Sequence, residues 1–131
     1  MTSEAHSQSA IRLAAAQENC PLWRNNSGAC RDTNNRLIRY GLGNDSKKIN
    51  DVWKSSDLIG PTPLLIQPHH VGRTFGIFTA VEVKAPDWKG VSNDHEQAQL
   101  NFIQDVINHG GFAGFCRSDD EYLQLLSRWR S

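Results

Sequence analysis

A glutamate and a lysine alternate at the end of the segment 78–84, which reads FTAVEVK. Side chains of a β-strand point alternately to its two faces, so Glu82 and Lys84 would share one face. Val81 and Val83 would then pack into the core on the other face. An acid and an amine held side by side suit phosphodiester hydrolysis: Glu82 would ligate a divalent cation, and Lys84 would lie beside the attacking water. The peptide carbonyl of Val83 would be a further hard oxygen ligand.

A second carboxylate, Asp57, opens the short apolar run of the motif SDLIG at 56–60. Two carboxylates on adjacent strands can bracket one ion, so Asp57 and Glu82 together predict a shared Mg²⁺ site. Both motifs also have plainer interpretations. Glu-x-Lys is typical of a surface salt bridge, and an isolated Asp often caps a turn.

Hydrophobic periodicity predicts the elements that must position these residues. Ser3 can cap a first helix over about 4–18, and the later helix with apolar positions from Leu100 to Ile107 begins at Ser92, Asn93 or Asp94 and stops at Gly110–Gly111. Ser118 and Glu121 form the capping box of a last helix. Strands are predicted at 37–42, 64–67, 75–84 and 112–116.

Two polar stretches separate the early elements. Residues 23–35 have the composition of an exposed loop, and residues 43–55 look like an insertion. The order is roughly α-β-β-β-α-β-α, which predicts an α/β fold with a mixed central sheet flanked by helices.

Length and composition limit the class of protein. A chain of 131 residues predicts a single domain over 1–131. It has no apolar run long enough to span a membrane, and its polar start does not resemble a signal peptide, so we expect a cytoplasmic protein. Three cysteines without C-x-x-C spacing predict reduced thiols. The formal net charge is zero. Several basic residues nevertheless gather in the first half, either as a phosphate-binding face or as a solvated surface: Arg24, Arg31, Arg36, Arg39, Lys47 and Lys48.

The motifs and their order resemble the virus-type replication-repair nuclease (VRR-NUC) domain, a branch of the PD-(D/E)XK superfamily, and most closely its stand-alone, phage-type members. The resemblance spans nearly the whole chain. Its pieces are Glu4, the motif RNNSG at 24–28, SDLIG at 56–60, EVKAP at 82–86, QLNF at 99–102 and GGFAG at 110–114.

This resemblance implies a restriction-endonuclease-like core and a role for each matching residue. The acids matching Asp57 and Glu82 would bind Mg²⁺, for which Mn²⁺ would substitute, and Lys84 would assist the attacking water. Glu4 would face the same ion directly or through water, although an acid in a first helical turn also suits the helix dipole. Gln99 would support the site, with Gln97 as the neighbouring alternative.

Other residues fit the resemblance less closely. The superfamily has Pro before the metal-binding Asp, where this chain has Ser56. Arg24, Asn25 and Asn26 match a family loop and offer hydrogen-bond donors for phosphate oxygens, as an ordinary polar loop also would. Adjacent His69 and His70 cannot readily converge on one metal ion from an extended segment, so a loop or hairpin tip is expected there.

The resemblance implies a metal-dependent DNA endonuclease with no organic cofactor and no covalent intermediate. Stand-alone members of the family act as homodimers on branched DNA such as Holliday junctions, so a homodimer in the cytoplasm of a bacterial host is expected if the chain is phage-encoded. The alternatives are a less selective DNase or nickase, and a nuclease-like module that binds nucleic acid without cutting it.

Overall fold

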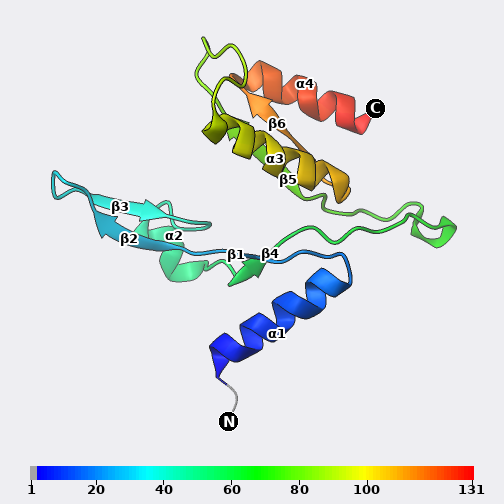
Figure 1. Ribbon diagram of the computed structural model, residues 1–131, viewed down its shortest axis with the longest axis horizontal. Coiled ribbons are helices and arrows are strands. Elements are labelled where there is room, and N and C mark those ends of the chain that lie inside the picture. Colours follow the sequence, from blue (N-terminus) through cyan, green and yellow to red (C-terminus); the bar gives the residue numbers. More distant parts are fainter. Residues whose placement is uncertain (1–2) are drawn as a thin grey trace. The chain divides into compact units, whose positions relative to one another are not determined.

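The computed structural model describes residues 3–131. Its elements form two compact units, one ending at Gly60 and the other beginning at Pro61 (Figure 1). Within residues 3–131, four α-helices and three two-stranded sheets confirm the α/β class that the periodicity predicted. The mixed central sheet and the restriction-endonuclease-like core stay predictions. None of the helices within residues 3–131 has the length and apolar character that a membrane span requires. The prediction of a single domain stays a prediction.

The first unit opens with helix α1, Glu4–Gln17. Ser3 accepts a hydrogen bond from the backbone N–H of His6 and so satisfies a donor that the first turn leaves unpaired. The predicted cap and the predicted helix are therefore confirmed to within one residue.

Two small antiparallel sheets complete the first unit. Strand β1 (Trp23–Arg24) pairs with β4 (Leu58–Ile59), and β2 (Gly28–Arg31) forms a hairpin with β3 (Leu37–Tyr40). Helix α2 (Lys47–Val52) lies between β3 and β4 and is capped by Ser46. The polar loop predicted over 23–35 is thus wrong in part, because backbone pairing forms two strands there that composition alone did not reveal.

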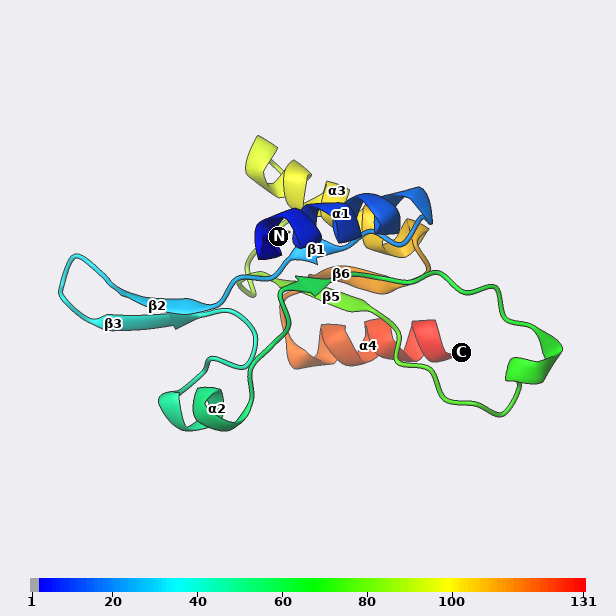
Figure 2. The ribbon, with the colours of Figure 1, turned by 90° about the horizontal axis from the view of Figure 1, so that it is seen from below.

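The second unit is built around a parallel pair of strands. Strand β5 (Thr79–Val83) leads into helix α3 (Asp94–Asn108), which returns the chain to β6 (Phe112–Cys116). The register pairs Thr79 with Phe112 and Val83 with Cys116. A parallel pair requires such a crossover, since the chain must run back to the starting end of the sheet. Helix α4 (Asp119–Arg130) follows β6, and α3 and α4 lie on opposite sides of the strands (Figure 2).

The core of the second unit lies between α3 and β6. Its buried apolar residues are Ile103, Val106, Phe112, Ala113 and Cys116. Helix α4 packs on β6 through the rings of Trp129 and Phe112, whose centroids are 5.5 Å apart. The buried residues between α3 and β6 hold α3 in place, and with it the residues of α3 that face β5.

Two of the predicted strands differ from the structure. No strand forms at 64–67; prolines at 61, 63 and 68 remove backbone donors around this segment, and a 3-10 helix, η1 (Pro68–His70), follows it. The strand predicted over 75–84 is confined to Thr79–Val83. It begins where its partner β6 begins, because a strand needs a neighbour to accept and donate hydrogen bonds.

The predicted burial of Val81 and Val83 is wrong. Their side chains are 36% and 76% exposed. The covered face of β5 is the one that carries Ala80 and Glu82, because α3 packs there, whereas α4 packs on β6. The polar face of β5 is thus the sheltered one, which changes the environment of its charges.

Candidate active site

Glu82 and Lys84 lie side by side at the end of β5, as alternation along the strand predicted. The ammonium Nζ of Lys84 is 3.9 Å from Oε1 of Glu82. The Lys84 side chain is 14% exposed and that of Glu82 is 37% exposed. The two charges are therefore close but do not form a direct hydrogen bond.

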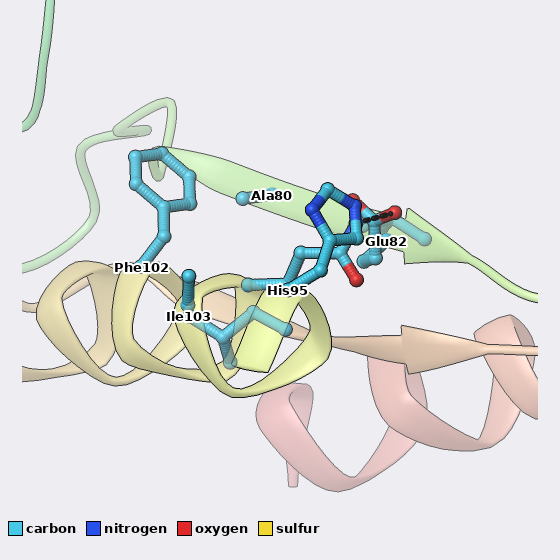
Figure 3. A pocket seen from close by; sticks show the side chains of 8 residues that line it. Ala80, Glu82, His95, Phe102 and Ile103 are labelled. Atoms are coloured by element: carbon cyan, nitrogen blue, oxygen red, sulfur yellow. Dashed lines mark hydrogen bonds between the residues drawn. The ribbon is translucent and has the colours of Figure 1, made fainter. Parts of the chain in front are cut away.

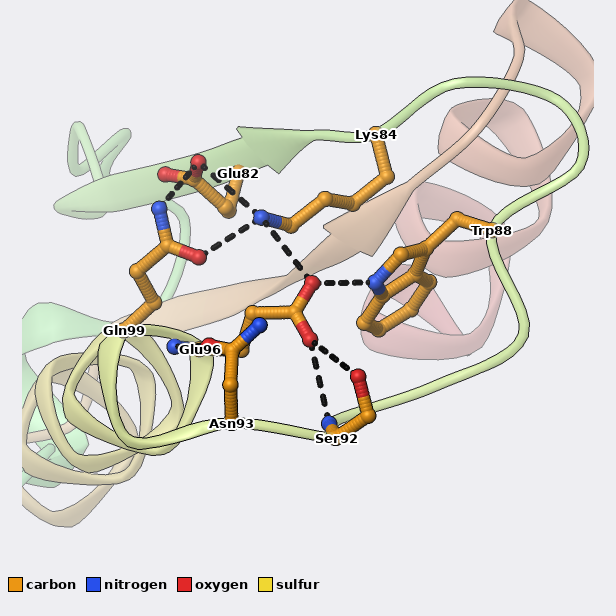
Figure 4. A network of polar contacts seen from close by, with 7 residues as sticks. All are labelled: Glu82, Lys84, Trp88, Ser92, Asn93, Glu96 and Gln99. Atoms are coloured by element: carbon orange, nitrogen blue, oxygen red, sulfur yellow. Dashed lines mark hydrogen bonds and ion pairs between the residues drawn. The ribbon is translucent and has the colours of Figure 1, made fainter.

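Gln99, from the second turn of α3, connects the pair. Its Oε1 accepts a hydrogen bond of 2.7 Å from Lys84, and its Nε2 donates one of 2.7 Å to Oε1 of Glu82 (Figure 4). An ammonium can only donate and a carboxylate can only accept, so the amide has one possible orientation. The structure thus brings Gln99 to the acid and the amine, while Gln97 donates to Asn101 on the same helix.

Glu96 is the second residue of α3 that faces the ammonium of Lys84. Its Oε2 lies 3.8 Å from the ammonium and accepts a hydrogen bond of 2.6 Å from the indole N–H of Trp88. Its Oε1 accepts from both the backbone N–H and the hydroxyl of Ser92, at 3.0 and 3.1 Å. Only 8% of Glu96 is exposed. Every oxygen of this buried carboxylate is therefore satisfied by the protein.

These contacts hold Glu96 in its charged form. The hydrogen bond from Trp88 lowers the pKa of Glu96 most, followed by the backbone N–H of Ser92, and the charge of Lys84 adds to the effect. Burial acts in the opposite direction without reversing the result. At neutral pH a negative charge consequently faces the Lys84 ammonium.

The ammonium of Lys84 lies beside a pair of aromatic rings. Nζ lies 5.8 Å from the ring centroid of Trp88 and 5.7 Å from that of Phe115. Both distances fall within the range in which a ring face attracts a cation. The rings also contact each other, with centroids 4.7 Å apart, so Trp88 serves the site from inside the fold rather than as an exposed base-stacking surface.

A pocket of about 420 Å³ opens beside Glu82, between β5 and α3. Figure 3 shows Glu82 and His95 at one end of it and Phe102 at the other. Most of its remaining wall is apolar, and Gln99 also lines it. The acid of the site is therefore accessible from the side of α3.

The other predicted carboxylates and the predicted nucleic-acid-binding residues lie in the first unit. Asp57 immediately precedes β4, Glu4 is the first residue of α1, and both are exposed. Asn25 is bonded within its own unit: its Nδ2 donates to the carbonyl of Ser56, and its N–H to that of Asp57, both at 2.8 Å. Asn25 thus positions the Asp57 segment. Arg24 and Asn26 are exposed.

No group of three or more His, Cys, Asp or Glu side chains gathers into a metal site within the part of the chain that the structure describes. His69 and His70 lie in η1, where Nδ1 of His70 accepts from the N–H of Gln67. The shared site of Asp57, Glu82 and Glu4 stays a prediction from the sequence.

Glu96 and Trp88 were not predicted as site residues. Their contact joins α3 to the loop after β5, and no periodicity reports such a contact. One local signal was available: Asn93 caps α3 by accepting from the N–H of Glu96, and Asn-x-x-Glu is the spacing of a capping box. It predicts a glutamate at the helix start without indicating that its carboxylate turns toward Lys84.

No family model, curated protein or solved structure matches the chain.

Proposed function

We propose that the chain is a metal-dependent DNA endonuclease of the PD-(D/E)XK type. The observation that carries this proposal is the arrangement of Glu82, Gln99 and Lys84, in which one amide bonds both an acid and an ammonium at the end of a strand. An ordinary surface salt bridge does not need an amide that bonds both of its charged groups. Hydrolysis of a phosphodiester by an activated water needs an oxygen ligand for a cation and a fixed positive charge beside it.

The oxygen donors of β5 suit a hard divalent cation. Oε1 of Glu82 accepts from Gln99, which leaves Oε2 without a hydrogen bond among residues 3–131. The carbonyl of Val83 also points away from β6, since the even-numbered residues of β5 bond to that strand, as Phe78 and Lys84 do. Carboxylate and peptide oxygens are the ligands that Mg²⁺ and Mn²⁺ prefer. Asp57 and Glu4 are the carboxylates that the sequence resemblance adds to this set.

Each side chain has a distinct role in the proposed reaction. Glu82 would hold the cation, which would lower the pKa of a bound water and stabilise charge on the phosphate. Lys84 makes one short hydrogen bond, to Gln99, and its two carboxylate neighbours lie at 3.8 and 3.9 Å. Its ammonium can therefore donate to the attacking oxygen and orient it. Hydrolysis proceeds in one displacement, without a covalent enzyme intermediate.

Branched DNA held by a homodimer is the substrate that the sequence resemblance favours. Two sites related by a two-fold axis suit a four-way junction. Within the first unit, the β2–β3 hairpin carries exposed Arg31 and Arg36 near its turn, where they could meet phosphates. Arg31 already donates one hydrogen bond to the carbonyl of Asn35. Arg39 and Lys47 bond Asn44 and Asp51, so part of the basic set is already engaged.

Cleavage assays test the proposal directly. Labelled four-way junction, linear duplex and single strand are incubated with the protein in Mg²⁺, in Mn²⁺ and in chelator. We expect metal-dependent cutting, fastest on the junction. Equal rates on the junction and the duplex would favour the less selective nuclease, and binding without cutting in either metal would favour the non-catalytic module.

Two substitutions test the assignment of the site. Glu82→Ala and Lys84→Ala should each lower cleavage by about a hundredfold or more while DNA binding persists. Lys89→Ala is the matched control, because Lys89 is an exposed lysine on the same connection between β5 and α3. Calorimetry should show weaker Mn²⁺ binding for Glu82→Gln and for Asp57→Asn. Normal cutting by both alanine variants would refute the assignment.

A further inference from the structure

We propose that Glu96 is a positioning residue that, together with Gln99, fixes the ammonium of Lys84. The inference deepens the proposed function and depends on it for its catalytic consequence. Neither the strand motif nor the capping position of Glu96 assigns it this role. The role follows from where its carboxylate lies and from what already bonds to it.

Glu96 is poorly placed to be a ligand of the cation. Two donors bond its Oε1 and a third, the indole of Trp88, bonds its Oε2 at 2.6 Å. These bonds occupy about three of the four acceptor positions of the carboxylate. The ammonium of Lys84 lies 3.8 Å from Oε2, where its charge would repel a metal ion. Glu82, which keeps one oxygen without such a bond among residues 3–131, is chemically different.

The carboxylate of Glu96 is rigidly placed. Glu96 lies in the first turn of α3, its own N–H bonds the side chain of Asn93, and the residue is 8% exposed. A buried charge whose hydrogen bonds are all made has few alternative positions, since each would leave donors unsatisfied. Glu96 is therefore a fixed point, whereas the lysine stem has four rotatable bonds.

Both neighbours act on the position of the Lys84 head group. The ammonium lies 2.7 Å from Gln99 and 3.8 Å from Glu96, and its Nζ is 5.8 and 5.7 Å from the ring centroids of Trp88 and Phe115. Without Glu96, only Gln99 and Glu82 would direct the head group. We therefore expect its loss to spread Lys84 over several rotamers and to reduce the time it spends beside the attacking water.

Chemical labelling tests the contact without metal or DNA. The variants are Glu96→Gln, Trp88→Phe, which removes the indole donor and keeps an aromatic ring, and Asp105→Asn as the control. Asp105 is likewise a carboxylate of α3, but its partner is His109. Each folded variant is treated briefly with an acetylating reagent, and Lys84 is quantified against exposed Lys89 by mass spectrometry. We expect labelling of Lys84 to rise roughly threefold or more in Glu96→Gln, less in Trp88→Phe, and not at all in Asp105→Asn.

Kinetics test the catalytic consequence. Glu96→Gln should lower kcat by about tenfold to a hundredfold, with KM for DNA and the half-saturating Mg²⁺ concentration within about twofold of the wild type. Combining Glu96→Gln with Trp88→Phe should cost no more than Glu96→Gln alone, because both act on one contact.

The outcomes separate the inference from the proposed function. Unchanged labelling of Lys84 in a folded Glu96→Gln protein would overturn the inference, as would a rise of equal size in Asp105→Asn. A rise in KM with kcat unchanged would do the same. If the wild type cuts no nucleic acid in any metal, the proposed function fails, and the labelling result still decides whether Glu96 fixes Lys84.

Discussion

At the scale of single residues, two glutamines of α3 that lie two positions apart have different surroundings. The side chain of Gln99 bonds Glu82 and Lys84, whereas that of Gln97 bonds Asn101 on its own helix. Gln99→Ala should therefore lower cleavage by about tenfold to a hundredfold, the effect typical of residues that orient a ligand. Gln97→Ala is the matched control and should cut within about twofold of the wild type. Equal losses in a rate assay on the preferred DNA would contradict this prediction.

The charge of Glu96 makes stability depend on pH. Its pKa in the folded protein lies below its ordinary value of 4.5, so the stabilisation is present above the pKa of the unfolded chain. It is lost as the pH falls through the folded pKa, because the unfolded chain then binds the proton more readily. Urea unfolding between pH 7 and pH 3 should show a smaller loss of stability for Glu96→Gln than for the wild type. Parallel curves would contradict the prediction.

Part of the site could be predicted from the sequence and part could not. Glu82 and Lys84 share a face because a strand repeats every two residues, which is a local property. Trp88 meets Glu96 only because the loop between them folds back on the start of α3, and no repeat in the sequence encodes that return. The choice between Gln97 and Gln99 likewise needed the packing of α3 on β5.

At the scale of elements, the junction between α3 and β6 depends on Gly111. A Cβ at this position would lie 2.5 Å from the carbonyl of Phe78 and 2.7 Å from a methyl of Val106. Gly111→Ala should therefore destabilise the protein by about 1–3 kcal/mol, since buried backbone and core must shift. Gly76→Ala, whose Cβ would meet nothing within 4 Å, should leave stability nearly unchanged. Urea denaturation of both variants measures the difference, and equal midpoints would contradict the expectation.

The helices that were predicted from their capping residues agree with the structure to within a residue or two, as at Ser3 and Ser118. Helix α2 was missed although Ser46 caps it, because residues 43–55 were interpreted as a polar insertion. Strands were predicted less well. The strand expected at 64–67 has no partner, and the β2–β3 hairpin arises in a segment rich in Asn, Ser and Gly. A strand depends on a neighbour that is distant in sequence, whereas a helix makes its hydrogen bonds within itself.

At the scale of the whole molecule, two cysteines report on its integrity. Cys30 is exposed in β2, whereas Cys116 is buried, and burial raises the pKa of its thiol. A thiol reagent at neutral pH should modify Cys30 rapidly and Cys116 only when the second unit opens. Protection of Cys116 should therefore decrease in Gly111→Ala. Rapid reaction of both thiols in the native protein, followed by mass spectrometry, would contradict the prediction.

Assembly can be measured at the same scale. Sedimentation equilibrium should give a mass of twice the 14.7 kDa of one chain if the homodimer that the sequence resemblance implies is formed. A mass equal to one chain would remove the symmetry argument for four-way junctions. The assignment of Glu82 and Lys84 would be unaffected.

The amide of Gln99 also affects the charge distribution of the protein before any ligand binds. Because it bonds both Glu82 and Lys84, whose charges lie 3.9 Å apart, it keeps them from forming a direct contact pair that would cancel their charge. The negative and positive charges at the end of this strand therefore stay apart. The carboxylate can still attract cations, and the ammonium can still attract anions.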